Sequence, residues 1–402
     1  MLNKSNFFNK YYSNSKKTKE NLKQTKFFFN SLVSDIENFK VPLLNSYKKD
    51  YEFDFSETLI KKFSKYKNII IFGMGGSILG AKSIYSFFKK KIKKQVFFFD
   101  NLDIDLHLKY NEIKNLKNSC FVIVSKSGNT IETLSNLSVV FSKIVLKNKL
   151  VVITESSDNN LMKFAIKNNA EIIEYKKFIG GRYSVLSEAG MFPAALMGLN
   201  LKKFRNLNKL IKNKSFISSL IENVSNIYTL NQQGISNSVV LSYDSKLNDL
   251  GYWYQQLVGE SLGKQGKGIN PTLSNAPKDH HSLLQLYLDG PRDKFFTFFN
   301  STDKGNNLKI SKVFFGKNTD FLRNKSLRKI VDKQCNAVKN IFKLKKIPYR
   351  EITFKKIDEE ELGKIFTFFV LETILLSRLL KVNPFNQPAV EQVKIETKRL
   401  LK

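Results

Sequence analysis

Five short apolar runs follow one another in the first half of the chain. They are KNIIIF (67–72), QVFFFD (95–100), SCFVIV (119–124), KLVVIT (149–154) and AEIIEY (170–175), and helical patterns separate most of them. Runs of this length with few polar alternations are typical of strands buried on both faces of a parallel sheet. The pattern predicts a doubly wound α/β unit with its ligand site at the carboxyl ends of the strands.

A second series of apolar segments predicts another unit of the same kind. NSVVLSY (237–243), KFFTFFN (294–300) and REITFKK (350–356) read as strands, and LNDLGYWYQQLVG (247–259) has helical apolar spacing. The expected fold is α/β, with two doubly wound, mainly parallel sandwich domains. The expected boundaries are 1–48 for an N-terminal helical segment, 49–197 for the first domain, 198–215 for a connector, 216–356 for the second domain and 357–402 for C-terminal helices.

The large positive charge changes this picture little. The 402 residues carry a formal net charge of +32, but 59 of the basic residues are Lys and 8 are Arg, without an obvious cluster. A nucleic-acid binder gathers its basic residues in a patch and favours the arginine fork for phosphate. We therefore interpret the lysines as solvated surface positions and expect no nucleic-acid partner.

The remaining composition indicates a cytoplasmic protein. The two cysteines, Cys120 and Cys335, cannot form a disulfide framework and suit a reducing compartment. The N-terminal residues have no apolar core of a secretory signal. The apolar stretch 365–380 contains Glu372 and Arg378 and is short for a membrane span, so no membrane partner is expected.

Two turns after predicted strands could bind phosphate. In FGMGGSILGAKS (72–83), Gly76 and its neighbouring glycines allow a ligand to approach the backbone, and Ser77 begins a helix. A dinucleotide fingerprint with Asp100 as the ribose carboxylate is the rival interpretation, but Ile78 stands where that motif has glycine. A glycine that serves only helix–strand packing is the other alternative.

The turn SKSGNTIETL (125–134) is the sharper signal. Ser125, Ser127 and Thr130 offer hydroxyl donors and Lys126 adds a cation, all at the expected start of a helix. Helix N-termini bind anions through free backbone N–H groups and the helix dipole. The spacing of Asn129 and Glu132 resembles a capping box.

Three further segments carry candidate catalytic groups. Arg182 follows a Gly-Gly pair in FIGGRYSVLSEAG (178–190), and Glu260 lies near a predicted helix C-terminus in QLVGESLGKQGKGINP (256–271). A helix C-terminus disfavours negative charge, which suits a base. His280 and His281 are adjacent, and adjacent helical side chains point about 100° apart, so they do not form a joint metal site. No other ligand spacing occurs, and we expect no metal.

Together the motifs resemble one family. GMGGSILG, SKSGNTIET, GGRYSVLSEAG, QLVGESLGKQGKGINP, DHHSLLQLYLDGP and NPFNQPAVEQVK occur in the order typical of glucose-6-phosphate isomerases (phosphoglucose isomerases), which consist of two sugar-isomerase (SIS) domains. The resemblance covers the chain from about residue 65 to 400 and is closest to the shorter bacterial members. Ala389 stands where glycine is common, and GMGG replaces the usual GIGG.

The resemblance implies an aldose–ketose isomerisation of glucose 6-phosphate and fructose 6-phosphate without cofactor. By position in the motifs, Glu260 is the base, Arg182 stabilises the enediolate, and His281 opens the sugar ring from the partner subunit of a homodimer. Lys394 is its companion at the ring oxygen. The implied phosphate and sugar contacts are Gly76, Ser77, Ser125, Lys126, Ser127, Thr130 and Gln387.

Other functions stay open at this point. A sensor that binds a phosphosugar without turning it over would need the phosphate turn but not Glu260, Arg182 and Lys394 together. A nicotinamide-dependent dehydrogenase rests on FGMGGS and Asp100. An isomerase that also accepts mannose 6-phosphate differs only in how the pocket reads the C2 hydroxyl.

Overall fold

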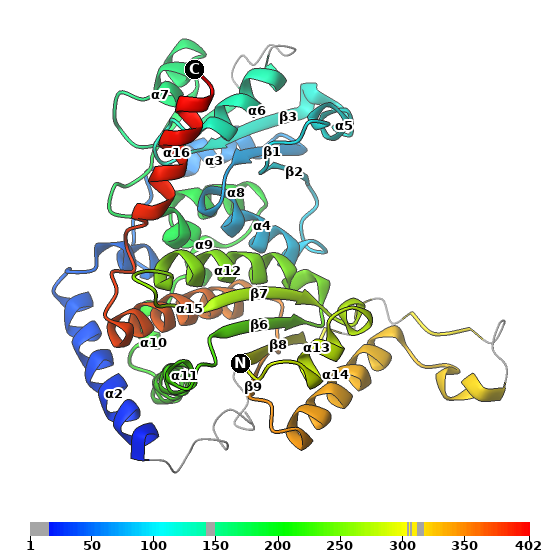
Figure 1. Ribbon diagram of the computed structural model, residues 1–402. Coiled ribbons are helices and arrows are strands. Elements are labelled where there is room, and N and C mark those ends of the chain that lie inside the picture. Colours follow the sequence, from blue (N-terminus) through cyan, green and yellow to red (C-terminus); the bar gives the residue numbers. More distant parts are fainter. Residues whose placement is uncertain (1–15, 142–148, 304, 306–307, 312–316) are drawn as a thin grey trace.

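The computed structural model of the chain describes residues 16–141, 149–303, 305, 308–311 and 317–402. Residues 1–15, part of the predicted N-terminal helical segment, lie outside the described residues. Two parallel sheets lie one above the other with helices between them (Figure 1). The predicted α/β fold with two mainly parallel sheets is therefore confirmed.

The first sheet contains all five predicted strands of the first unit. Its strands are parallel and lie in the order β2-β1-β3-β4-β5. Because the carboxyl ends of β1 and β3 are in register at Gly73 and Val124, the two turns predicted to bind phosphate leave the sheet side by side. The strands are β1 (Asn68–Gly73), β2 (Gln95–Phe99), β3 (Ser119–Val124), β4 (Leu150–Thr154) and β5 (Glu171–Glu174).

The second sheet has one strand more than the sequence predicts. Its order is β7-β6-β8-β9, again parallel throughout. The unpredicted strand, β7, has the sequence NPTLSN and lies at the sheet edge, where a proline is tolerated and a continuous apolar run is not needed. The strands are β6 (Asn237–Ser242), β7 (Asn270–Asn275), β8 (Lys294–Ser301) and β9 (Tyr349–Phe354).

The helices form three layers around the two sheets. Alternate residues of β1 show why: Ile69 and Ile71 belong to the central core between the sheets, whereas Ile70 and Phe72 pack under helices on the outer face. The outer layers comprise α5 (Leu106–Asn111), α6 (Ile131–Phe141) and α7 (Asn160–Lys167) on the first sheet and α13 (Leu284–Asp289) and α14 (Leu327–Leu344) on the second.

The central layer joins the two units, and the site lies in it. There α4 packs on α8 and α12, and α12 packs on α15 and β7. The elements of this layer are α3 (Glu57–Ser64), α4 (Gly76–Phe88), η3 (Gly181–Leu186), α8 (Glu188–Leu196), α11 (Lys214–Gln232), α12 (Asn248–Leu262) and α15 (Glu359–Leu380), with α2 (Lys16–Glu37) packed on α11 and α15.

Short elements connect these layers. Two of them, α9 and α10, lie in the segment predicted as a connector, and the predicted domain boundaries remain predictions. α16 rises from the level of α12 toward the top of the molecule in Figure 1. These elements are η1 (Pro42–Tyr47), η2 (Leu116–Asn118), α9 (Leu201–Phe204), α10 (Leu207–Leu210), η4 (Ser245–Leu247), η5 (Lys278–His281), η6 (Lys317–Leu322) and α16 (Pro388–Leu400).

The most apolar late stretch is a core helix. Most residues of α15 are buried, and they contact α11, α12 and α9. A helix that is apolar on all sides is expected at the centre of a large core as well as in a membrane. No helix within the described ranges has the length and hydropathy needed to cross a membrane.

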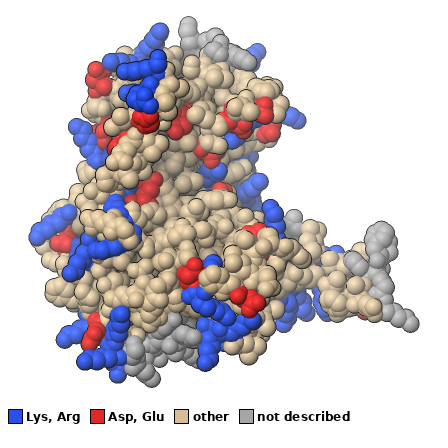
Figure 2. Space-filling model, viewed as in Figure 1, with Lys and Arg blue, Asp and Glu red and all other residues tan. Residues whose placement is uncertain are grey.

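Charged side chains are dispersed over the visible face of the molecule. Figure 2 shows Lys and Arg over both units, with Asp and Glu between them, and no single basic patch dominates this face. This distribution agrees with the interpretation of the lysines as solvated surface positions.

A buried ion pair crosses the core of the second unit. Arg350 on β9 and Glu372 on α15 are 0 % and 1 % exposed, and the guanidinium makes a two-pronged contact with the carboxylate. Arg350 Nε also donates to Thr297 Oγ1 at 2.9 Å. Burial of each charged group costs hydration free energy, and the opposite charge beside it compensates that cost.

We predict that Arg350→Met lowers the free energy of unfolding by about 3–5 kcal/mol, because the Glu372 carboxylate is left buried without a counter-charge. Urea unfolding measures this loss. The matched control is Arg350→Met combined with Glu372→Leu, which removes both charges and is expected to recover most of the loss. A single variant as stable as the wild type would contradict the prediction.

Candidate active site

The centre of the site is a buried arginine with every donor occupied. Arg182 on η3 is 1 % exposed. Its Nε donates to Ser261 Oγ at 2.9 Å, and its Nη1 donates to Glu260 Oε2 at 3.1 Å and to Gln387 Oε1. Its Nη2 donates to the carbonyl oxygens of Pro384 and Asn386. These are the five N–H donors of a guanidinium, and a lysine could not replace them.

Glycine holds this arginine against the first turn. A Cβ built on Gly76 would lie 2.1 Å from the carbonyl carbon of Gly181 and 2.5 Å from the backbone nitrogen of Arg182. Only glycine therefore allows the start of α4 to touch η3. The next residue of η3, Tyr183, is fixed from the other side, because its hydroxyl contacts Ser261 Oγ at 2.8 Å.

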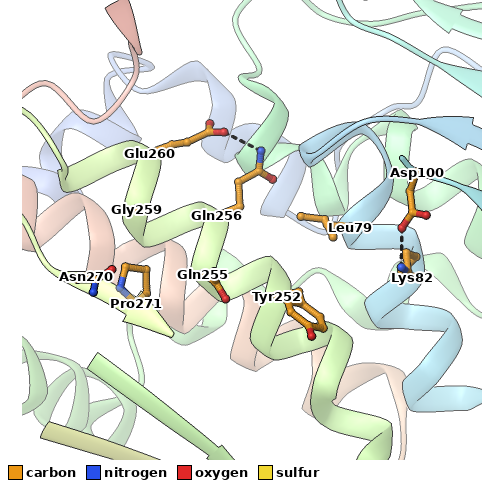
Figure 3. A pocket seen from close by; sticks show the side chains of 10 residues that line it. All are labelled: Leu79, Lys82, Asp100, Tyr252, Gln255, Gln256, Gly259, Glu260, Asn270 and Pro271. Carbon is orange, nitrogen blue, oxygen red and sulfur yellow. Dashed lines mark hydrogen bonds and ion pairs between the residues drawn. The ribbon is translucent and has the colours of Figure 1, made fainter. Parts of the chain in front are cut away.

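The predicted base lies on the last turn of α12. Glu260 is partly exposed, and Gln256, one turn earlier on the same helix, donates from Nε2 to Glu260 Oε1 at 2.9 Å (Figure 3). Each carboxylate oxygen thus has a donor, one from Arg182 and one from Gln256. Gln256 was not among the predicted site residues, although its i,i+4 spacing from Glu260 is visible in the sequence.

Glu260 faces two cavities. One, of about 450 Å³, is a size that suits a small-molecule ligand and joins the end of α12 to the start of α16. The other, of about 630 Å³, runs between α4 and α12 and is the one drawn in Figure 3. The first is lined by Gly259, Glu260, Gly263, Lys264, Gln265, Asn383, Asn386, Gln387, Pro388, Ala389 and Val390.

A lysine that the sequence analysis also missed lies in the smaller cavity. Lys264 Nζ donates to the carbonyl oxygens of Glu260 and Ser261, each at 2.7 Å. Loss of hydration and the nearby charge of Arg182 lower the pKa of Lys264 to about 8, although Glu260 opposes the shift. Its place in the chain, four residues after Glu260, was the available signal.

The predicted phosphate turn follows β3 and leads into α6. Ser125 Oγ and Thr130 Oγ1 lie 3.0 Å apart, so the two hydroxyls bracket the turn. Gly128 has a φ of +64°, and a Cβ there would lie 1.8 Å from Asn159 Oδ1, so glycine is required. This geometry presents hydroxyls at the amino end of α6.

One detail of this turn was predicted wrongly. The expected capping box of Asn129 and Glu132 is not formed, because Asn129 Oδ1 accepts from the backbone N–H of Asn160 at the start of α7. Helix α6 begins at Ile131, after Thr130. The side chain of Asn129 therefore ties the two helix starts together instead of closing α6.

The other predicted phosphate contacts occupy the same edge of the first sheet. Ser77 lies in the first turn of α4 and is partly exposed, and Ser127 is exposed. Lys126 Nζ donates to the Lys177 carbonyl oxygen at 2.7 Å and lies 3.5 Å from Glu155. Lys126 is thus held beside the turn by protein acceptors.

The two adjacent histidines have different surroundings. His280 Nε2 and the Tyr243 hydroxyl lie 2.7 Å apart, and loss of hydration lowers the pKa of His280. His281 is exposed. Asn270, at the start of β7, lines the same cavity as Glu260. His281 lies on η5, which follows the other end of β7. At the rise of a β-strand the two ends of β7 are about 16 Å apart. The structure therefore does not bring His281 to Glu260 within one chain.

Lys394 is also apart from the central group. It lies on α16, its Nζ is 2.7 Å from Glu391 Oε1, and both side chains are 58 % exposed. Gln387, immediately before α16, does reach the site through its contact with Arg182. The structure thus brings together Arg182, Glu260 and Gln387, and places Gly76 against them.

The dinucleotide interpretation and metal binding gain no support from the geometry. Asp100, its proposed ribose carboxylate, lies 2.5 Å from Lys82 Nζ and 3.7 Å from Lys109 Nζ. In the part of the chain that the structure describes, no three His, Cys, Asp or Glu side chains converge to hold a metal ion.

Comparison with solved structures shows the same fold. The chain superposes with a TM-score of 0.76 on a hypothetical protein of Thermus thermophilus, at 23 % identity, covering 91 % of this chain and 89 % of that one. It superposes with a TM-score of 0.71 on a glucose-6-phosphate isomerase of Chlamydia trachomatis, at 18 % identity, covering 86 % of this chain and 71 % of that one.

Sequence comparison is more specific. The chain is 33 % identical over 374 residues to the glucose-6-phosphate isomerase of Methanocaldococcus jannaschii, covering 88 % of this chain and 89 % of that protein. It is 30 % identical over 348 residues to the glucose-6-phosphate isomerase of Campylobacter jejuni, covering 83 % and 85 %. The profile of the family described as phosphoglucose isomerase matches residues 52–402. The chain belongs to the phosphoglucose isomerase family.

Proposed function

We propose that the chain catalyses the reversible isomerisation of glucose 6-phosphate and fructose 6-phosphate, a step of glycolysis and gluconeogenesis. The observation that carries the proposal is the pairing of a carboxylate with a buried guanidinium beside a cavity of about 450 Å³. The family membership and the names of the relatives support the same reaction.

In this proposal Glu260 is the base that moves a proton between the two carbon atoms. It removes the proton from C2 of the open-chain aldose, and the electron pair moves to the carbonyl oxygen at C1 to give an enediolate. The proton of the C2 hydroxyl passes to the oxygen at C1, and the same carboxyl group returns a proton to C1, which gives the ketose. The support is geometric: both oxygens of Glu260 have donors that fix the carboxylate, one from Arg182 and one from Gln256.

Arg182 stabilises the negative charge that develops on the enediolate. Since its five donors already have protein acceptors, the guanidinium is fixed before substrate arrives, and little reorganisation is needed during the reaction. Its burial strengthens its charge effect on a neighbouring anion.

The phosphate group does not react, and we propose that it binds at the turns after β1 and β3. Ser77, Ser125, Lys126, Ser127 and Thr130 lie at this edge of the first sheet. Binding energy from a nonreacting phosphate orients the reacting carbons. Gly76 and Gln387 border the sugar.

We further propose a homodimer in which the partner subunit's His281 opens the sugar ring. The exposure of His281 and its position at the far end of β7 from Glu260 support this arrangement. Lys394 is proposed as its companion at the ring oxygen, which requires α16 to approach the sugar. Two buried free thiols agree with a cytoplasmic location.

Glu260→Gln is expected to lower kcat by about a thousandfold, because the amide cannot accept the proton. The amide oxygen still accepts from Arg182, so fructose 6-phosphate binding is expected to persist in isothermal titration calorimetry. The matched control is Glu171→Gln on β5, which removes a surface ion pair with Lys62 and should leave activity unchanged. Turnover by Glu260→Gln at the wild-type rate would contradict the proposal.

Mixing two inactive variants tests the shared site. Glu260→Gln and His281→Ala subunits, refolded together, form hybrids with one site that carries both changes and one that carries neither. We expect about a quarter of wild-type activity in a 1:1 mixture, because about half of the dimers are hybrids with one intact site each. A mixture as inactive as its two parents would contradict supply of His281 by the partner.

A further inference from the structure

Lys264 is held in an unusual place for a lysine. It follows the last turn of α12, and its ammonium donates to two main-chain carbonyl oxygens of that turn, those of Glu260 and Ser261. Carbonyls at a helix C-terminus lack partners inside the helix and attract a cation. Glu260 and Ser261 are two of the residues that accept hydrogen bonds from Arg182, so Lys264 fixes the backbone from which both side chains extend.

Lys264 also lines the smaller cavity, together with Glu260 and Gln387. The charged groups that face it are Arg182 from η3 and Glu260 from α12. The other basic residue of the turn, Lys267, is engaged elsewhere, since its Nζ donates to the Leu380 carbonyl oxygen at 3.0 Å. The segment that leads into α16 contributes only uncharged polar residues to the cavity lining, namely Asn383, Asn386 and Gln387.

We infer that Lys264 is a positioning residue for the Glu260 base and, in its protonated form, a second positive charge beside Arg182 for the anionic intermediate. The inference rests on the proposed isomerase function. Lys264 acts through two hydrogen bonds that hold the last turn of α12 and through its charge in the cavity. It need not touch the reacting carbons.

The cost of this arrangement indicates a functional role. Loss of hydration and the charge of Arg182 lower the pKa of Lys264 to about 8, from an ordinary value near 10.5. At neutral pH the protonated lysine is therefore less favourable in the fold than in the unfolded chain. Groups with such shifts are typical of functional sites.

The same shift sets the expected pH dependence. Below about pH 8 Lys264 carries a proton and its charge, and above it the charge is lost, so activity should fall as the pH rises. Burial raises the pKa of Cys120 and of Cys335 to about 12 and lowers that of His280, so the shifts of these three groups move their titration away from this range. The second pKa of a phosphate monoester is about 6, so a sugar phosphate is mostly the dianion above about pH 7.

The experiment is kcat for fructose 6-phosphate conversion between about pH 6.5 and 9.5 in the wild type, Lys264→Arg and Lys264→Met. The wild type is expected to lose about tenfold in kcat between about pH 7 and pH 9. Lys264→Arg keeps its charge and should stay active through pH 9. Lys264→Met should be about tenfold slower at pH 7, with little change in KM and without the alkaline fall.

Thermal unfolding of each variant separates positioning from folding. A residue that only closes the helix end would change the melting temperature and leave the pH profile in place. A flat wild-type profile, an alkaline fall retained in Lys264→Arg, or a wild-type kcat in Lys264→Met would each overturn the inference. If Lys264→Met does not fold, the wild-type and Lys264→Arg profiles still decide. A wild type inactive at every pH would instead overturn the proposed function on which the inference rests.

Discussion

The arrangement of the site depends on one buried charge that must have five acceptors. Arg182 is removed from water, and a guanidinium with missing partners would be very costly there. The acceptors come from two separate regions, Glu260 and Ser261 at the end of α12 and residues 384–387 before α16. Satisfying Arg182 therefore draws three distant parts of the chain to one point at the junction of the two units.

The two sheets serve this junction in different ways. The first sheet supplies turns from its carboxyl edge, and the close contact of Gly76 with Gly181 aligns one of those turns with η3. The second sheet supplies α12, whose last turn carries the carboxylate. Because α4 packs on α12, the helix after the first predicted phosphate turn and the helix that carries Glu260 belong to one continuous core. A substrate bridging the turns and Glu260 would thus meet groups whose spacing is already fixed.

The fold was readable from the sequence where burial alone decides it. Strands covered on both faces must be continuous apolar runs, and those strands were predicted. The edge strand β7 was missed because it has a neighbouring strand on one side only. Its sequence, NPTLSN, therefore needs no continuous apolar run, and its proline, which has no N–H group to donate to a neighbouring strand, is tolerated. The capping box was wrong because Asn129 Oδ1 accepts from the backbone N–H of Asn160 at the start of α7, a residue 31 positions along the chain.

The site was partly predictable for a related reason. Arg182 stood out because arginine is rare in this chain, and Glu260 stood out by its position near a helix C-terminus. Nothing in the sequence shows that these two residues, 78 positions apart, form an ion pair. Gln256 and Lys264 each lie four residues from Glu260 along the chain, so both could have been singled out once Glu260 was predicted as the base. The separation of His281 from Glu260 follows from the direction of β7. Because β7 was not predicted, this separation could not be predicted either.

The measurement that tests the central claim most directly is the conversion of fructose 6-phosphate in D2O, followed by NMR. A proton carried by the Glu260 carboxyl group exchanges with solvent before it returns to carbon. We predict glucose 6-phosphate that carries deuterium at C2. Bound phosphosugar with no product and no exchange, or product with no deuterium at C2 after many turnovers at equilibrium, would contradict an enediolate mechanism with Glu260 as the base.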